Sequence, residues 1–448
     1  MKGGITIPND DFIISILNLS KNDIESFEPV VESYKVNYYI TLKIRHIECP
    51  YCGGFMFSNG VKVKEIKHPS LRDYDGFIHW RAHRYKCRDC SKTHLEPNPF
   101  TFPGFQVSFA VMQRIMNELR NLNYTYKDIA LRNCVSVTTV QSYFDSWVHI
   151  PRIYLPEWIG MDEIHSDMAK YGSAYLCILT DCTHRGVFEV LPSRSKLTLS
   201  KYFESIPLLE RNKVRYVTMD MWEPYKAVAY KYFKNCIVAV DPFHVIKHLS
   251  TCFTLFRISI MNQVDKDSIT YYLLKSWHYL LETDCILDNK PEYNKKLKRS
   301  CNRRDLYEML LTINEDFTLA YQLKESYRKF NAEATPDNAE EWLTILINSF
   351  TSSNLHIYFD FISLLNHWKP EIINSFKRPY GSHKLSNAYT ENVNGKIRSY
   401  LAVSNGTSNF DRFRKKIIYA LNDKIFYSLT QTLHSCKRKS KPRGLYNK

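Results

Sequence analysis

The chain has 448 residues and carries 61 Lys and Arg side chains against 46 Asp and Glu, which gives a formal net charge of +15. This length allows about three domains and a large buried core. There is no apolar run of about 18 residues and no signal-peptide pattern, so the sequence predicts neither a membrane span nor secretion. We therefore expect an intracellular protein with a polyanionic partner, nucleic acid first, although a well-solvated basic surface is the alternative.

Residues 1–100 are predicted to contain a zinc ribbon, after a short helix at Phe12–Leu17 and a strand at Tyr34–Leu42. Four of the twelve cysteines form two close pairs, Cys49 with Cys52 and Cys87 with Cys90, and each pair can offer two thiolates to one Zn²⁺. Gly53 and Gly54 are expected to supply positive φ angles in the first turn. The gap between the pairs exceeds the ~15–20 residues of the common template, so a redox thiol pair or coincidence is the alternative. The other cysteines are scattered and are expected to be reduced thiols.

Residues 101–150 are predicted to form a DNA-binding helix-turn-helix domain. Helical spacing runs through Tyr126–Trp147, with Cys134 in the sharp turn. Val137 and Val140 are expected to point inward from the second helix. The polar residues expected to face DNA are Thr138, Thr139, Gln141 and Ser142. An ordinary helical hairpin is the alternative.

Residues 151–250 are predicted to form the first part of a ribonuclease H-like α/β catalytic core, in which three strands in a meander precede alternating helices and strands. The expected strands end at Asp162, cover 174–181 and 186–191, end at Asp220 and cover 236–241, with helices at 197–209 and 225–233. That fold presents acidic groups at the ends of its first and fourth strands, here Asp162 and Asp220. Glu163, expected to face the other side of its strand, and Asp241 are the weaker alternatives.

The remaining segments complete a multidomain α+β protein. Residues 251–380 show no clear strand pattern, which predicts an all-helical insertion into the core. Residues 381–430 are predicted to be the last part of the core, with Glu391 on a helix. Residues 431–448 form a basic tail that either contacts phosphates or only adds solubility.

Two strand-end aspartates and a helical glutamate suit a site that holds two divalent metal ions for phosphodiester chemistry. Carboxylate ligands favour Mg²⁺ or Mn²⁺. Asp162 is expected to contact both ions, and Asp220 and Glu391 one each. His244 would contact the scissile phosphate or orient a carboxylate, unless its role is only structural. The candidate contacts to the DNA backbone are Lys247, Lys396 and Arg398, for which solvated surface charge is the alternative.

Taken in order, these motifs resemble the bacterial insertion-sequence transposases of the ISL-three type, in the DDE superfamily. The resemblance also rests on the segments Ile159–Glu163, Val217–Met221, Val240–Leu249, Leu385–Asn387 and Asn409–Phe413. It implies structural zinc, a DDE core with two Mg²⁺ or Mn²⁺ ions, and double-stranded DNA as partner, both as terminal inverted repeats and as target. It further implies a place at the nucleoid in the bacterial cytoplasm, and a homodimer or larger assembly when two DNA ends are held together.

The resemblance implies two reactions in one site. Water first frees the 3′ end of the element, and this 3′-OH then attacks target DNA. The chain departs from the family pattern near Ala388 and at Asn392, where glycines are usual, and at Asn405–Gly406. The alternatives are a catalytically inactive DNA-binding protein derived from a transposase, and a ribonuclease H-like nuclease that cuts without joining strands.

Overall fold

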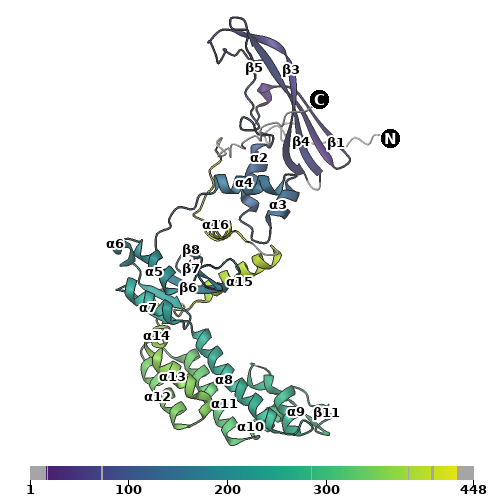
Figure 1. Cartoon of the computed structure of the whole chain (residues 1–448). Coiled ribbons are helices and arrows are strands. Elements are labelled where there is room, and N and C mark those ends of the chain that lie inside the picture. Colours follow the sequence, from purple (N-terminus) through teal and green to yellow (C-terminus); the bar gives the residue numbers. More distant parts are fainter. Residues whose placement is uncertain are drawn as a thin grey trace, which may run out of the picture. The chain divides into compact units, whose positions relative to one another are not determined.

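The computed structural model describes Leu17 and residues 19–71, 74–283, 285–381, 383–404 and 408–430. The chain divides into two compact units, Met1–Pro151 with Lys396–Lys448, and Arg152–Gly395 (Figure 1). Both units contain helices and a sheet, so the predicted mixed α+β class is confirmed. The basic tail, Asn405–Gly406 and the predicted helix before Leu17 lie outside the described residues.

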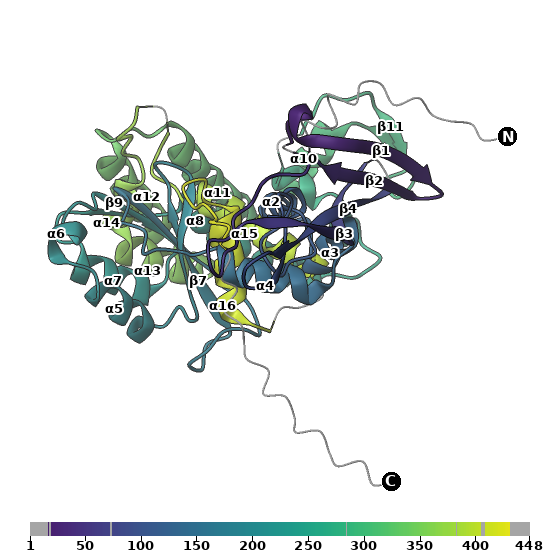
Figure 2. The same ribbon diagram turned by 90° about the horizontal axis from the view of Figure 1, so that it is seen from above.

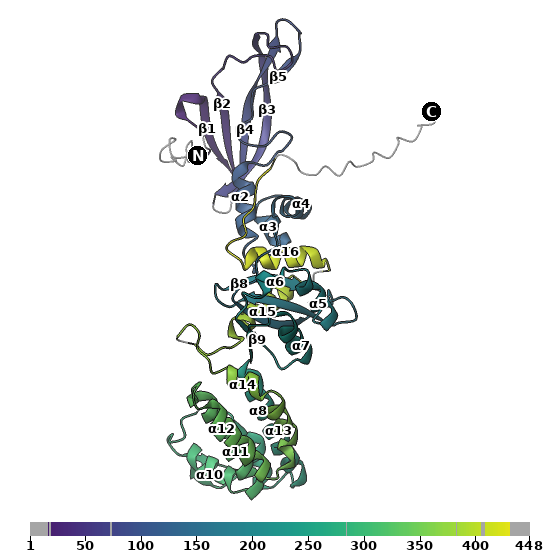
Figure 3. The ribbon, with the colours of Figure 1, turned by 90° about the vertical axis from the view of Figure 1, so that its left-hand side faces the viewer.

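The first unit is built on a five-stranded sheet (Figure 3). Its strand order is β1 (Ile24–Glu32), β2 (Lys35–Leu42), β4 (Tyr74–Cys87) and β3 (Met56–Leu71), and β5 (Thr93–Leu95) pairs with β4. Side chains alternate along β4, so Ile78, Trp80 and Ala82 enter the core. The predicted strand at Tyr34–Leu42 is present as β2, whereas the sequence pattern did not predict β1. The two cysteine pairs lie before β3 and at the end of β4, so the region predicted as a zinc ribbon is part of this larger sheet.

Helices of the first unit follow the sheet. They are α2 (Phe109–Glu118), α3 (Tyr126–Arg132), α4 (Val137–Trp147) and α16 (Phe410–Ala420). Hydroxyl side chains of Ser108, Thr125 and Ser136 cap α2, α3 and α4. Cys134 lies in the turn before α4 as predicted, with a φ of 50°. Val140 is buried as predicted, but Val137 is 37% exposed because it is the first residue of α4 and has no preceding turn to cover.

The sheet and the helices of the first unit are joined at Lys67. Its backbone N–H donates to Gln106 O at 2.9 Å, and its carbonyl accepts from Ser108 N at 2.9 Å. The Lys67 ammonium group donates to the carbonyl of Cys134, whose thiol donates to Asp75 on β4. The turn between α3 and α4 is therefore attached to both β3 and β4.

The second unit contains a mixed five-stranded sheet. Its strand order is β10 (Ile237–Val240), β9 (Tyr216–Met219), β6 (Trp158–His165), β7 (Tyr175–Asp181) and β8 (Gly186–Leu191). Strands β6, β7 and β8 are antiparallel neighbours, whereas β6, β9 and β10 run parallel. All five predicted strands are present. Asp220 directly follows β9 as predicted, but β6 continues past Asp162 to His165.

Helices α5 (Lys196–Glu204), α6 (Leu208–Arg211) and α7 (Glu223–Tyr232) also belong to the second unit (Figure 2). The single helix predicted at 197–209 is two helices, because Pro207 lacks the N–H that a continuous helix would need. Leu199 and Phe203 of α5 and Val228 of α7 share a buried core with Met161 and Leu179 of the sheet.

The insertion supplies most of the remaining helices of the second unit. They are α8 (Pro242–Gln263), α9 (Ile269–Ser276), η2 (His278–Leu281), α10 (Arg303–Leu311), α11 (Glu315–Glu333), α12 (Ala339–Ser352), η3 (His356–Tyr358), α13 (Phe359–His367) and α14 (Lys369–Asn374). Among the described residues, no helix has both the length and the apolar character of a membrane span.

The prediction of an all-helical insertion is wrong in one place. A short antiparallel hairpin joins β11 (Glu292–Asn294) to β12 (Arg299–Cys301), between η2 and α10. Each strand has three residues, and most of their side chains are exposed. Such strands have no apolar alternation, which is the signal that identifies a strand in a sequence.

Helix α14 connects the insertion to the sheet and to α7. Asn374 Nδ2 donates to the carbonyl of Val238 on β10 at 2.9 Å. Glu371 is 1% exposed and accepts hydrogen bonds from Lys226 Nζ at 3.2 Å and Tyr230 OH at 2.7 Å, both on α7. This buried carboxylate is therefore stabilised by one cation and one hydroxyl group.

We expect Lys226→Met to lower the free energy of unfolding by about 3 kcal/mol, because it leaves a buried carboxylate without its counter-ion. Urea denaturation monitored by circular dichroism would measure the change. Lys231→Met is the matched control, since Lys231 lies on the same helix and pairs with Glu204 at the same 3.2 Å, but both side chains are 56% exposed. Equal destabilisation by the two substitutions would contradict the assignment of Glu371 as a buried ion-pair partner.

Candidate active site

Helix α15 (Ala388–Val403) carries Glu391 and reaches strand β6 at Gly160. A Cβ atom at Gly160 would lie 2.2 Å from Thr390 Oγ1 and 2.5 Å from Thr180 Oγ1. These two hydroxyl groups are buried and hydrogen bonded to each other at 2.7 Å. Glycine at this position therefore allows the start of α15 to pack directly on the sheet.

Two asparagines attach this segment to β6. Asn387 Nδ2 donates to the carbonyl of Met161 at 2.9 Å, and its backbone N–H donates to Asp241 Oδ1 at 3.2 Å. Asn394, one turn beyond Glu391, donates through Nδ2 to Asp162 Oδ2 at 2.6 Å. Asp241, the alternative acid at the end of β10, therefore positions the segment that leads into α15.

The predicted acids gather in two overlapping groups. Asp220, His244 and Glu391 form one group, and Asp162, Glu163 and Asp220 form the other. Within each group the potential ligand atoms all lie within 4.8 Å of one another. Among the described residues, no group of this size contains Asp162 and Glu391 together, so Asp220 is the residue that the two groups share.

The prediction that Glu163 faces away from this cluster is wrong. A ligand atom of Glu163 lies within 4.8 Å of ligand atoms of Asp162 and Asp220. Strand β9 ends at Met219 while β6 continues, so Asp220 lies beyond its own strand, where side chains from both faces of β6 can reach it. Glu163 also forms an ion pair with Arg194.

Negative charge is concentrated around Asp220. Burial, together with the charges of Asp162, Glu163, Asp241 and Glu391, raises the pKa of Asp220 to about 9. The buried Glu163 Oε2 atom accepts no hydrogen bond from the described residues, and the buried Asp220 Oδ1 atom faces the ring nitrogen Nε2 of His244 at 3.1 Å. The cluster therefore has carboxylate oxygens that can act as ligands, and a bound cation would reduce the repulsion between its acids.

His244, near the N-terminus of α8, lies between two of these acids. Its Nε2 atom is 3.1 Å from Asp220 Oδ1 and 3.2 Å from Glu391 Oε1. Of the two roles predicted for His244, orientation of a carboxylate is therefore the one for which this geometry is suited.

Arg194 is a residue at the cluster that the sequence analysis missed. Its guanidinium group pairs with Glu163 and lies 4.2 Å from the ring centre of Trp222 and 4.0 Å from that of Tyr175. Arg194 follows β8 in a loop without a recognisable motif. Only the pairing of β8 with β7 and of β7 with β6 brings it near the acids, so no local signal could have found it.

The other predicted site residues are distributed over both units. Lys247 is exposed on α8 in the second unit, whereas Lys396 and Arg398 are exposed on the part of α15 assigned to the first unit. On α4, Thr138 and Ser142 are exposed, and Thr139 and Gln141 are half-buried. A groove of about 460 Å³ is lined by Thr138, Thr139, Ser142, Tyr143 and Gly104–Gln106. The hydroxyl groups of Thr138 and Thr139 are each hydrogen bonded to Ser136 Oγ at 2.8 Å. Part of their hydrogen-bonding capacity is therefore used at the N-cap of the helix.

The two cysteine pairs meet in the first unit. All four sulfur atoms lie within 4.8 Å of one another, with 3.5 Å between Cys49 and Cys90 and 3.5 Å between Cys52 and Cys87. A tetrahedral site with metal–sulfur bonds of about 2.3 Å has sulfur atoms about 3.8 Å apart. The cluster is therefore close to the size of such a site.

The two glycines after Cys52 have different roles. Gly53 has a φ of +73°, as predicted, but Gly54 does not adopt a positive φ. A Cβ atom on Gly54 would lie 1.9 Å from Asp89 Oδ2, so its missing side chain instead makes room for the second cysteine turn.

We expect Gly160→Ala to lower the free energy of unfolding of the second unit by about 1–3 kcal/mol, because an added methyl group would overlap Thr390 and Thr180. Urea denaturation would measure this loss. The control is Gly395→Ala on α15, where an added Cβ meets no atom within 4 Å and alanine favours the helix. If Gly160→Ala were as stable as the control, close packing at Gly160 would not be the constraint that holds α15.

Comparison with known proteins places this arrangement in a family. Residues 159–417, which include Asp162, Asp220, His244 and Glu391, match the family model for the ISL-three (ISL3) type of DDE transposase. The chain is also 21% identical over 298 residues to the transposase for insertion sequence element IS1001 of Bordetella parapertussis, an alignment that covers 66% of this chain and 70% of that protein. The family match covers more than half of the chain, so the chain belongs to the ISL-three family of transposases.

Proposed function

We propose that the chain binds the terminal inverted repeats of an insertion sequence and catalyses metal-dependent DNA cleavage and strand transfer. The observation that carries this proposal is the convergence of Asp162, Asp220 and Glu391, from β6, the end of β9 and α15, into two ligand groups that share one residue. The strand order, an antiparallel meander followed by two parallel strands, supports a ribonuclease H-like core.

The acid cluster fits two hard divalent cations, Mg²⁺ or Mn²⁺. Its donors are oxygen atoms, the buried Glu163 Oε2 accepts no hydrogen bond from the described residues, and its carboxylates repel one another. Two such ions, when bound, would make the attacking water or 3′-OH more acidic and stabilise the leaving oxygen. The predicted ligands Asp162, Asp220 and Glu391 are all present, but the grouping favours Asp220, rather than Asp162, as the shared ligand.

The surrounding side chains hold these ligands in place. His244 Nε2 lies within 3.2 Å of Asp220 and Glu391 and keeps their carboxylates directed toward one side. Asn394 holds Asp162 Oδ2, and the backbone N–H of Glu163 donates to Asp162 Oδ1 at 2.7 Å. Ligands oriented in this way lose little freedom when the ions and DNA bind.

The first unit is proposed to recognise DNA. Helix α4 follows α3 after a sharp turn and presents Thr138, Thr139, Gln141 and Ser142 as in a helix-turn-helix, while the four cysteines would hold a structural Zn²⁺. The net charge of +15 favours phosphate binding, with Lys247, Lys396 and Arg398 as proposed backbone contacts. We further propose action at the nucleoid in the cytoplasm, with a homodimer or larger assembly holding two ends.

No observation favours the inactive alternative. Ala388 and Asn392 depart from the family pattern, yet both lie within the continuous helix α15 that carries Glu391. Neither departure removes a proposed ligand.

We expect Asp162→Asn and Glu391→Gln each to lower DNA nicking by about 10³-fold, because each removes charge that the metal ions and the transition state require. The assay uses purified protein and labelled DNA carrying the inverted repeats that flank the coding region, with Mg²⁺, Mn²⁺ or EDTA. Repeat binding measured in EDTA is expected to be unchanged. The control is Asp167→Asn, an exposed aspartate just beyond β6.

Three outcomes of this assay separate the hypotheses. Nicking at the repeat boundary followed by joining supports the transposase. Binding without nicking by the natural sequence, under either metal, would support the inactive DNA-binding protein. Nicking without joining would support a nuclease.

We expect the purified chain to contain one tightly bound zinc ion, measured by mass spectrometry of metals. Cys87→Ser is expected to release the zinc and lower the thermal unfolding temperature of the first unit, since metal binding to such sites contributes directly to folding. Cys285→Ser is the control because Cys285 lies in the insertion, away from the four-cysteine group. Retention of zinc by Cys87→Ser would show that the cluster is not its ligand set.

A further inference from the structure

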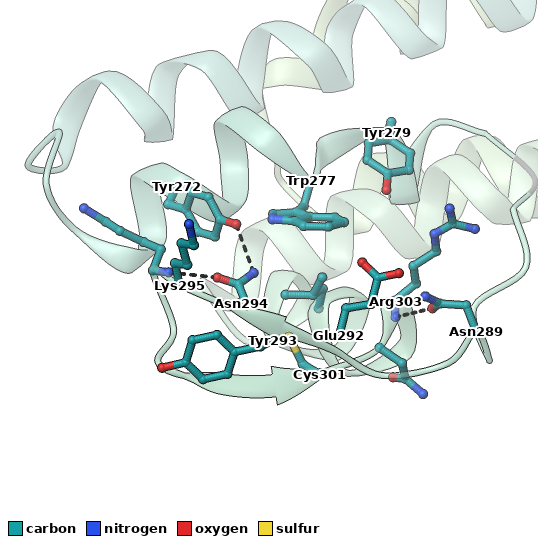
Figure 4. Close-up of a pocket in the computed structure, with 13 residues that line it drawn as sticks. Tyr272, Trp277, Tyr279, Asn289, Glu292, Tyr293, Asn294, Lys295, Cys301 and Arg303 are labelled. Carbon is teal, nitrogen blue, oxygen red and sulfur yellow. Dashed lines mark hydrogen bonds between the residues drawn. The ribbon is translucent and has the colours of Figure 1, made fainter.

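The hairpin of the insertion borders a cavity that the proposed function does not use. Tyr272, Trp277 and Tyr279 line one side, and hairpin residues Glu292–Lys296 line the other (Figure 4). The cavity volume is about 430 Å³, within the roughly 300–1,000 Å³ range of small-molecule sites. We name it the hairpin cavity.

The walls of the hairpin cavity are held by specific hydrogen bonds. Asn294 donates through Nδ2 to the hydroxyl of Tyr272 at 2.9 Å (Figure 4). Its Oδ1 atom accepts from the backbone N–H groups of Lys296 and Leu297, both at 3.1 Å. The Asn294 side chain thus fixes both the hairpin turn and the Tyr272 ring on the opposite wall. The shape of the cavity is therefore set by hydrogen bonds within the insertion.

The chemistry of the cavity suits a flat ring with hydrogen-bonding edges. The ring centres of Trp277 and Tyr279 are 5.9 Å apart, and Tyr293 on the hairpin is 65% exposed. Trp277 Nε1 is buried and has no hydrogen-bond partner among the described residues, so its N–H is free for an acceptor. Glu292, which also lines the cavity, is an acceptor for the N–H groups of a base.

The edge of the cavity is strongly basic. From Ile286 through Arg304, with both ends included, there are seven Lys and Arg residues and two acids. One of these acids, Asp288, is paired with Arg304 at 2.5 Å. The lysines Lys290, Lys295, Lys296 and Lys298 are exposed and have no ion pair within the described part of the chain. Positive charge outside and aromatic rings inside is the combination that binds unpaired nucleic acid strands.

We propose that the hairpin cavity binds one unpaired nucleotide of the DNA substrate, with the base among Trp277, Tyr279 and Tyr293 and the adjoining phosphates on Lys295 and Lys296. A paired base within a duplex could not enter, because its faces are already stacked. This proposal rests on the proposed function for its DNA substrate, but it concerns the insertion and not the acid cluster.

The test measures binding in EDTA, so that no cleavage is required. The probes are a blunt duplex and a forked duplex of the same sequence with a 2-aminopurine among its unpaired nucleotides. We expect the full chain to bind the forked duplex about tenfold more tightly and to quench its 2-aminopurine fluorescence, as stacking of a base on an aromatic side chain would produce.

Variants of the cavity separate the two parts of the proposal. Tyr293→Ala and Trp277→Ala are expected to remove the preference for the fork and the quenching, while blunt-duplex binding stays unchanged. Lys295→Ala combined with Lys296→Ala is expected to lower the slope of log affinity against log salt for the fork by about 1.4, at about 0.7 per phosphate on a single strand. The matched control combines Lys231→Ala with Lys329→Ala, two exposed lysines on α7 and α11.

The outcomes distinguish this proposal from the proposed function. If the natural sequence nicks DNA but binds both duplexes equally, or if the tyrosine and lysine variants keep its preference for the fork, the hairpin cavity does not bind an unpaired nucleotide. If fork binding depends on the cavity but no metal supports nicking, the proposed catalytic activity fails and the cavity site stands. Because Tyr293 is exposed, its substitution keeps the test valid even if Trp277→Ala fails to fold.

Discussion

The close approach of α15 to β6 at Gly160 is the constraint on which the candidate active site depends. Glu391 follows Thr390, and Thr390 can reach Thr180 only because no side chain stands between them at Gly160. Asn387 and Asn394 attach the same segment to β6 on either side of Glu391. The position of an acid far along the chain is thus set by neutral, buried groups that take no part in binding a metal ion.

The second requirement is electrostatic. Acidic groups from β6, β9, β10 and α15 lie close enough that their charges, with burial, raise the pKa of Asp220. In the absence of cations this repulsion opposes folding. Any cation that binds the folded cluster and not the unfolded chain would therefore stabilise the second unit as well as serve its chemistry.

Sequence patterns predicted the sheet of the second unit well because its strands are apolar, separated by clear turns and arranged in a familiar order. They also selected Asp162, Asp220, Glu391 and His244, which the structure brings into the two groups that share Asp220. The patterns failed where the answer depends on neighbours from distant parts of the chain. Glu163 contacts the acid cluster because β9 ends before β6 does. Arg194 lies near the acids because of the order in which the strands pair. Neither cause produces a recognisable pattern in the local sequence.

The β11–β12 hairpin escaped prediction for a different reason, since its strands are short, polar and exposed. The hydrogen bonds of Lys67 that join the sheet to the helices of the first unit could not be predicted from the sequence either, and they have a mechanical consequence. Because Lys67 holds the turn before α4 through Cys134, the sheet and helix α4 cannot swivel independently. If this unit binds DNA as proposed, the sheet and helix α4 would contact it as one rigid body. If both parts touch the same duplex, inserting one base pair between their contacts would rotate one contact by about a tenth of a helical turn, and no hinge could compensate.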